Sequence, residues 1–156
     1  MIVITSIIRS FYNLAVGNLW FPEQFCGKIL QMEDGLKFKI FRHMRLRKKT
    51  SPDAAAIFIV RFKFKKFSHR TNMKASRIPI PLIAGFPGFR DKVWMIDPDT
   101  DYWQGVYQWE NVQAIEKYKK SFVLAIMNKR ALKNSISYKT IPGISIEDYL
   151  LSVAVD

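Results

Sequence analysis

The stretch that decides the fold runs from Ala56 to Phe64 and reads Ala-Ile-Phe-Ile-Val-Arg-Phe-Lys-Phe. One set of alternate positions, from Phe58 to Phe64, is entirely apolar, and the other set contains Ile57 and Ile59. Since successive side chains of a β-strand point to opposite faces of the sheet, this period of two predicts a strand with two apolar faces. Such a strand has to be covered on both sides.

Two further strands are predicted downstream, after a short helix. Ser68 or Thr71 is suited to cap a helix that ends near Arg77, because Pro79 and Pro81 interrupt its continuation. Residues 89–96 and 102–109 then carry apolar and aromatic residues on either side of a compact polar turn. This arrangement predicts a β-hairpin rich in aromatic residues.

A long amphipathic helix and a last strand complete the unit. Apolar residues recur at three- and four-residue steps through residues 111–131, which predicts one continuous helix. Residues 135–140 alternate again, and Pro142-Gly143 ends that strand. The order strand, helix, hairpin, helix, strand is the split βαβ pattern, so residues 56–142 predict an α+β, ferredoxin-like antiparallel sheet. Residues 146–155 are expected to add a helical turn and an edge strand.

The chain is expected to consist of a basic N-terminal extension over residues 1–53 and the ferredoxin-like domain over 54–156. Apolar residues at helical spacing predict an amphipathic helix over 2–16, and alternation predicts a strand over 36–40. Residues 42–51 hold a dense run of Arg and Lys, which we expect to form a loop before the domain.

The charge of the chain is large and uneven. The formal net charge is +12, and residues 1–75 hold 15 Lys and Arg against 4 Asp and Glu. Such asymmetry indicates either an anionic partner or a solvated basic face. The single cysteine, Cys26, excludes a disulfide within the chain and favours a reducing, cytoplasmic setting. The apolar stretch 1–8 is too short to span a membrane.

A βαββαβ sheet has helices on one face only, whereas the predicted strands are apolar on both faces. The second face must therefore be covered, and pairing of two identical sheets is the commonest solution. We expect a homodimer through the open sheet face, with the N-terminal helix and strand as an alternative cover.

Several segments resemble the dimeric α+β barrel superfamily, most closely its antibiotic-biosynthesis monooxygenase branch. The resemblance covers residues 57–142 and is carried by Phe86–Trp94, Gly105–Glu110, Tyr118 and Ser135–Tyr138. It implies a pocket between sheet and helices, face-to-face dimers, and a cofactor-independent monooxygenase acting on a planar aromatic or polyketide-like substrate. Haem-degrading members need a helical His, and residues 111–131 contain none.

Candidate site residues follow from this expected pocket. Arginine can stabilise an enolate or phenolate oxygen, and Trp, Tyr or His can stack on or hydrogen-bond to a planar ligand. The catalytic candidates are Arg61, Arg90, Trp94 and Tyr107, and the ligand-binding candidates are Trp103, Tyr118 and His69. The alternative is that the aromatics are core and interface and the arginines lie at the rim. Cys26, His43 and His69 lack metal-ligand spacing, so no metal or other cofactor is predicted.

Three other functions compete with catalysis. The same fold can serve as a non-catalytic ligand-binding or assembly module. The basic half and the aromatic sheet suggest RNA binding, but residues 104–109 lack the core motif of RNA-recognition sheets, so nucleic acid is disfavoured. The helix over 2–16 with the basic run suggests membrane attachment; because only Arg9 charges that helix, a helix packed against the domain is expected.

Overall fold

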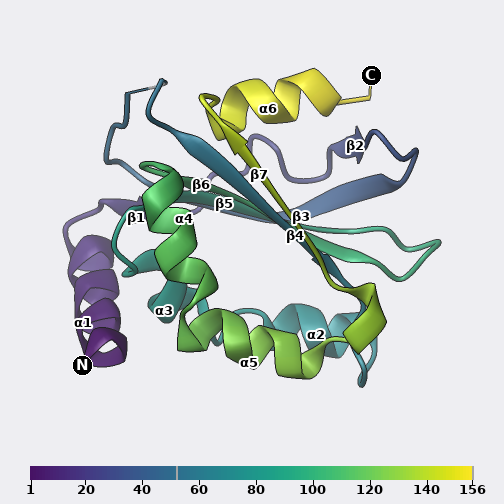
Figure 1. Cartoon of the computed structure of the whole chain (residues 1–156), viewed down its shortest axis with the longest axis horizontal. Coiled ribbons are helices and arrows are strands. Elements are labelled where there is room, and N and C mark those ends of the chain that lie inside the picture. The colour runs from purple at the N-terminus through teal and green to yellow at the C-terminus, as the bar shows by residue number, and fades with distance from the viewer. Residues whose placement is uncertain (52, 156) are drawn as a thin grey trace.

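A computed structural model describes residues 1–51 and 53–155. Its centre is one seven-stranded antiparallel sheet in the order β1-β3-β5-β6-β4-β7, with β2 also paired to β3 (Figure 1). The strands are β1 Leu19–Trp20, β2 Ile29–Gln31, β3 Lys37–Leu46, β4 Ala56–Phe62, β5 Phe89–Ile96, β6 Trp103–Trp109 and β7 Ser137–Pro142. The α-helices are α1 Ile2–Ala15, α2 His69–Ala75, α3 Ile80–Ala84, α4 Val112–Lys119, α5 Phe122–Arg130 and α6 Ile146–Val153.

The predicted ferredoxin-like unit is confirmed. Its four strands lie in the order β7-β4-β6-β5, and the hairpin β5–β6 pairs from Phe89 opposite Trp109 to Ile96 opposite Trp103. The helix after β4 is short, as expected: Ser68 caps its start, it ends at Ala75, and a turn over residues 76–79 leads to α3. Pro81 is tolerated in α3 because it lies in the first turn, where its missing N–H needs no partner.

The N-terminal extension is part of the same sheet. Strand β3 pairs with β5 from Lys39 opposite Ile96 to Arg45 opposite Asp91. The expectation that residues 42–51 form a loop is therefore wrong for Arg42 and Arg45, which lie in the strand. The alternation becomes irregular after Ile40 because a register shift falls between Ile40 and Arg42, and a bulge moves later side chains to the other face.

The long helix predicted over residues 111–131 is two helices. Asn111 caps α4 by accepting from the Ala114 N–H at 2.9 Å, and Ser121 caps α5 by accepting from the Leu124 N–H. A side-chain cap satisfies backbone donors that a new helix start leaves free, so a serine inside an apolar periodic stretch can begin a second helix. The bend lets both helices follow the curved sheet (Figure 1).

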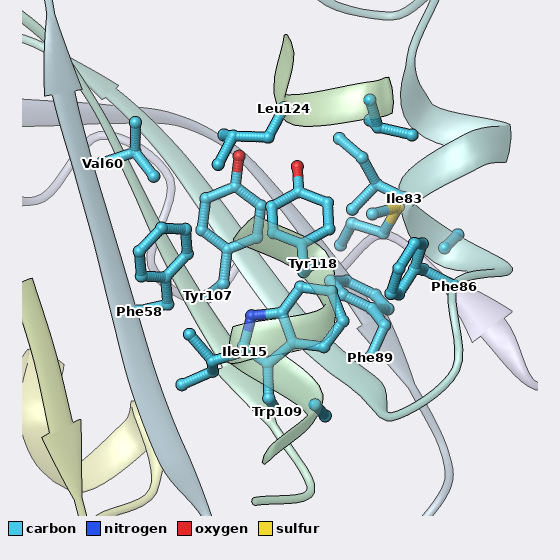
Figure 2. Close-up of a cluster of buried hydrophobic side chains, with 14 of the residues drawn as sticks. Phe58, Val60, Ile83, Phe86, Phe89, Tyr107, Trp109, Ile115, Tyr118 and Leu124 are labelled. Carbon is cyan, nitrogen blue, oxygen red and sulfur yellow. The ribbon is translucent and has the colours of Figure 1, made fainter. Parts of the chain in front are cut away.

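The sheet separates two hydrophobic cores. The first core lies between one sheet face and helices α3, α4 and α5, and its side chains from β4 are Ala56, Phe58, Val60 and Phe62. Phe58 and Val60 are shown in Figure 2. The second core lies on the opposite face and contains Ile57 and Ile59. The prediction of a strand with two apolar faces is confirmed.

The second face is not open. It is covered by α6 and by the segment around β2, which lie on the other side of the sheet from helices α2 to α5 (Figure 1). Leu150 of α6 and Leu30 of β2 are both 0% exposed, and Ile146 is 1% exposed. The expectation of an uncovered face for a partner chain is therefore wrong, because the C-terminal residues form a longer helix than the single turn predicted.

Helix α1 lies at the edge of the molecule beside α3 (Figure 1). Its buried residues are Ser6 and Ser10, whereas Ile4, Ile8 and Phe11 face outward. The expectation that this helix packs against the domain is confirmed by its contact with α3, but the contact is made by Ser6 and Ser10 and not by the apolar residues, because it is too close for large side chains. Among the described residues, no helix is both long and apolar enough to cross a membrane.

Candidate functional site

A cavity of about 430 Å³ lies between the first face of the sheet and helices α2, α3 and α5. Its walls are mainly aliphatic and aromatic, and the described residues that line it include no Asp or Glu. The lining residues Phe67 and Ile78 are 73% and 77% exposed, so the cavity reaches the surface beside them. Its size and apolar walls are typical of a site for a small organic ligand.

Lys92 is the one amine inside this cavity, which we call the Lys92 cavity. It comes from the middle of β5, where it pairs with Tyr107 of β6, and it is 4% exposed. Its Nζ donates to the Tyr107 hydroxyl oxygen at 2.7 Å and lies 4.1 Å from the ring centroids of both Trp94 and Tyr107. Within the described chain, no carboxylate forms an ion pair with it.

Burial lowers the pKa of Lys92 well below its ordinary value, and the positive charge of Arg42 lowers it further. Arg42 is held close by bonds to α2 and the residue after it, donating to the Ser76 hydroxyl at 2.7 Å and to the Met73 carbonyl at 3.0 Å. A lysine with a lowered pKa has a larger neutral fraction near neutral pH, and the neutral amine accepts protons. The arrangement therefore supplies a base.

This lowered pKa predicts a pH-dependent stability. Between the lowered folded value and the unfolded value of about 10.4, the unfolded chain binds the additional proton, so stability rises with pH across that window, by up to about 1.4 kcal/mol per unit. Lys92→Met removes this linkage. In urea unfolding, we expect the variant to exceed the parent in stability near neutral pH, and this advantage to shrink as the pH approaches the unfolded value. An advantage that is constant with pH would contradict the lowered pKa.

Two tyrosines line the cavity near the amine: Tyr107, which accepts from it, and Tyr118, whose ring lies next to that of Tyr107. Tyr107 and Tyr118 project side by side from β6 and α4, with their hydroxyls toward the same end of the cluster (Figure 2). Burial raises the pKa of Tyr107, and burial together with the neighbouring Tyr107 raises the pKa of Tyr118 well above its ordinary value. Both phenols are therefore neutral at physiological pH, and each can donate a hydrogen bond to a ligand oxygen.

The two indoles of the cavity are fixed by different neighbours. The Trp94 ring lies close to both the Lys92 amine and the Arg42 guanidinium, whose carbon is 5.4 Å from the ring centroid. Trp103 donates from Nε1 to His69 Nδ1 at 3.0 Å, and the other ring nitrogen of His69 is 2.7 Å from an Asp101 carboxylate oxygen. His69 does not line the cavity; it orients Trp103.

Gly105 of β6 leaves the space that this cluster occupies. A Cβ atom at this position would lie 2.9 Å from the ring of Tyr107 and 3.4 Å from Cε of Lys92. The Tyr107 ring would have to shift, because 2.9 Å is shorter than real Cβ contacts, whereas 3.4 Å to Lys92 is an ordinary contact. A glycine here permits the tyrosine and the lysine to lie together on one face.

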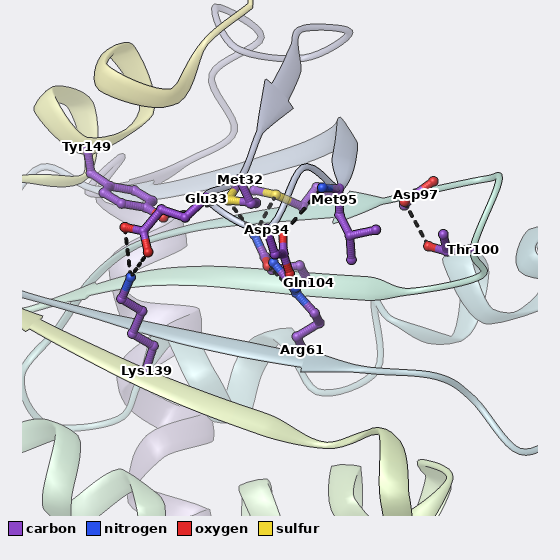
Figure 3. A network of polar contacts seen from close by, with 11 residues as sticks. Met32, Glu33, Asp34, Arg61, Met95, Asp97, Thr100, Gln104, Lys139 and Tyr149 are labelled. Carbon is purple, nitrogen blue, oxygen red and sulfur yellow. Dashed lines mark hydrogen bonds and ion pairs between the residues drawn. The ribbon is translucent and has the colours of Figure 1, made fainter.

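The structure brings four of the seven predicted site residues into the cavity: Trp94, Trp103, Tyr107 and Tyr118. Arg61 is on the opposite face, where it donates from Nε to Gln104 at 2.9 Å and pairs with Asp34 (Figure 3). Arg90 donates to Glu110 at 2.8 Å and to Thr50 at 2.6 Å, and it too lies outside the cavity. Strand phase explains both positions, since Arg61 alternates with Phe62 and Arg90 sits at a bulge.

Lys92 was missed by the sequence reasoning. The available signal was the period of two along residues 89–96, which places Lys92 on the same face as Trp94. A lysine that alternates with buried aromatic residues in a central strand has no path to solvent, so it marks a functional candidate.

The sheet aromatics are covered by helices. Trp94, Trp103, Tyr107 and Trp109 are 6%, 3%, 2% and 0% exposed. An RNA-recognition sheet stacks bases on exposed aromatic rings, so this face does not offer that mode of binding. No group of three or more His, Cys, Asp or Glu side chains within residues 1–51 and 53–155 is placed to hold a metal ion.

Comparison with known proteins gives a family match and several similar folds. Residues 57–141 match the family described as "Putative mono-oxygenase ydhR". An uncharacterized ferredoxin-fold protein from Listeria monocytogenes related to antibiotic biosynthesis monooxygenases superposes with a TM-score of 0.51 and 8% identity, over 83% of this chain and 85% of that one. A monooxygenase-like protein from Listeria innocua superposes with a TM-score of 0.50 and 11% identity, over 88% of each chain. At these identities, the likeness shows the fold alone.

The shared region is shorter in other matches. The chain spans about half the length of an anthrone oxidase-like protein (56%) and of a putative monooxygenase from Fusobacterium nucleatum (48%). None of the curated proteins matches the sequence.

Proposed function

Because this chain belongs to the ydhR family of putative mono-oxygenases, we propose that it oxidises a planar, electron-rich aromatic substrate in the Lys92 cavity without a metal or organic cofactor. The observation that carries the proposal is the buried amine of Lys92, which pairs with no carboxylate of the described residues and lies beside the neutral Tyr107 phenol in an apolar cavity that Tyr118 also lines. A base in a water-poor site is what deprotonation of a weakly acidic C–H or O–H group requires.

The chemistry assigns a role to each group. The neutral Lys92 amine removes a proton from a methylene carbon that is conjugated with the substrate carbonyl through the ring system, and Tyr107 or Tyr118 donates a hydrogen bond to the enolate oxygen. The resulting carbanion transfers electrons to dioxygen and forms a carbon–oxygen bond, and the Lys92 ammonium returns its proton to the peroxide. Trp94 supplies an aromatic wall against which the substrate ring can stack.

The second half of the reaction forms the ketone. The neutral Lys92 amine removes the remaining C–H proton, the peroxide O–O bond breaks and the carbon becomes a ketone. The departing hydroxide then takes that proton from the Lys92 ammonium and leaves as water. A methylene substrate and one dioxygen thus give a ketone and one water. One oxygen atom enters the product, dioxygen is the only oxidant, and the amine ends as it began.

Oxygen uptake tests this function. The full chain would be mixed with an anthrone in the presence of a metal chelator, and oxygen consumption would be followed together with incorporation of labelled dioxygen into the product. We expect one labelled oxygen per product molecule. Tight binding of the aromatic compounds with no oxygen uptake above the uncatalysed rate would refute catalysis and leave a ligand-binding module.

Filling the cavity should block binding. Met127 of α5 lines the cavity, whereas Ala125 of the same helix is exposed and does not. We expect Met127→Trp to weaken binding of a hydroxyanthraquinone, measured by calorimetry, by about tenfold or more. The larger side chain occupies the space that the ligand needs, and placing both in the cavity would overpack it. Ala125→Trp is the matched control and should bind like the parent. Equal affinity in both variants would place the ligand elsewhere.

A further inference from the structure

The outer face of α1 is apolar although it faces solvent. Ile4, Ile8 and Phe11 are 65%, 64% and 60% exposed, and their spacing of four and three residues places them in one stripe along the helix. Ser6 and Ser10, on the opposite side, are 2% and 3% exposed. The helix therefore buries its small polar residues and presents its large apolar ones.

This orientation is fixed by the backbone. A Cβ atom on Gly85, at the end of α3, would lie 1.7 Å from the carbonyl oxygen of Ser6, so the two helices touch with no side chain between them. Arg9 adds a hydrogen bond from Nη1 to the Gly85 carbonyl at 3.0 Å. Rotating α1 to bury its stripe would push isoleucine or phenylalanine into this contact, so the stripe stays outside.

Aromatic residues border the stripe. Tyr12 is 64% exposed on the same helix, and Trp20 and Phe21, just after it in the chain, are 37% and 46% exposed. The Arg47 guanidinium carbon lies 5.5 Å from the Trp20 ring centroid. Tyrosine and tryptophan are enriched at the boundary between lipid headgroups and acyl chains, and a nearby arginine can contact the headgroups.

Positive charge lies next to the aromatics. A hollow of about 630 Å³ beside α1 is lined by Arg9, Tyr12, Arg47 and Lys48. Its other charged residues, Arg90 and Glu110, form an ion pair with each other at 2.8 Å. Residues 36–51 hold seven Lys and Arg and no Asp or Glu. Pairing two copies of this surface would bring like charges together, whereas a negatively charged surface complements it.

We propose that this surface, formed by Ile4, Ile8, Phe11, Tyr12, Trp20 and Arg47, docks the protein on anionic membrane. The apolar stripe enters the acyl boundary, the aromatic rings lie at headgroup level, and Arg47 with Lys48 pairs with lipid phosphates and carboxylates. The helix lies in the plane of the membrane and does not cross it.

Sedimentation with vesicles tests the proposal on the full chain. Phosphatidylcholine vesicles with and without phosphatidylserine would be compared at low and high salt. We expect binding to the anionic vesicles that weakens as salt is added, because screening removes the attraction of the basic residues. Absence of binding to anionic vesicles at low salt would overturn the proposal.

Two pairs of variants locate the contact. We expect Ile4→Ser/Ile8→Ser/Phe11→Ser to weaken binding by about tenfold or more, since three apolar side chains no longer enter the lipid. Phe122→Ser/Leu132→Ser/Leu151→Ser removes three exposed apolar residues elsewhere and should bind like the parent. Likewise, we expect Arg47→Glu/Lys48→Glu to weaken binding to anionic vesicles by about tenfold or more. Lys37→Glu/Lys39→Glu, which makes the same change of charge at the far end of β3, should weaken binding much less.

Other results of these experiments would exclude docking of this surface on a membrane. If the stripe variant sediments like the parent, or both charge variants lose affinity alike, the attraction is a general effect of net charge. If the parent instead has the mass of a dimer by light scattering and the stripe variant has that of a monomer, the surface joins two copies of the chain.

Discussion

Lys92→Met is expected to reduce turnover of an aromatic substrate by about 100-fold or more, the smaller end of the range for loss of a positioned general base. Methionine is similar in length and apolar, so it fills the space between Trp94 and Tyr107 without an amine. Oxygen uptake measures the effect, and calorimetry with a hydroxyanthraquinone shows whether binding persists. We expect nearly unchanged binding together with the loss of turnover.

The control for this prediction is Lys39→Met, on the exposed side of β3, which should retain full turnover. Lys92→Arg adds a second test, because a guanidinium keeps its proton and cannot act as the base. Parent turnover should rise with pH through the lowered pKa of Lys92, since deprotonation produces the active amine. Normal turnover in Lys92→Met with a folded protein would exclude the amine from the chemistry.

Leu150→Ala is expected to lower the free energy of unfolding by about 2–5 kcal/mol, because it removes a fully buried side chain and leaves a cavity in the second core. Leu151→Ala, one residue further along α6, changes a side chain that is 57% exposed and should cost less than about 0.5 kcal/mol. Urea unfolding of both variants measures the difference.

The same pair of variants tests how the second face is covered. If α6 were displaced and a partner chain lay against the sheet, both leucines would have similar small effects and the parent would have the mass of a dimer by light scattering. A large effect at Leu150 alone, with an unchanged mass, indicates that the chain covers its own sheet. A homodimer through this face requires α6 to leave it.

Most of the regular structure could be predicted from local patterns. The hairpin strands and β4 follow the period of two, and the cap at Ser68 fixes the start of α2. The extent of β3 could not be predicted, because its bulge after Ile40 depends on pairing with β5. The break after Lys119 could not be seen in the sequence because apolar residues continue at helical spacing past Ser121. Only the hydrogen bond that the Leu124 N–H donates to the Ser121 hydroxyl oxygen marks the start of the second helix.

The site was predictable in part. The aromatic residues of the hairpin predict a cluster. Whether an arginine belongs to it depends on which face of the strand it occupies and on ion pairs with residues distant in the sequence, such as that of Arg61 with Asp34. The cover over the second face also depends on long-range contacts, since Leu30 and Leu150 are far apart in the sequence but belong to the same core. A local pattern shows that a face needs a cover, but it does not show which segment provides it.

Strand β5 carries the Lys92 amine on one side and Val93 and Met95 on the other. The packing of the second core thus supports the strand that positions the Lys92 amine. Altered packing beneath this strand would tilt the amine relative to Tyr107 without touching the cavity wall. Substitutions at the residues under α6 therefore offer a way to change the geometry of the Lys92 cavity from the opposite side of the sheet.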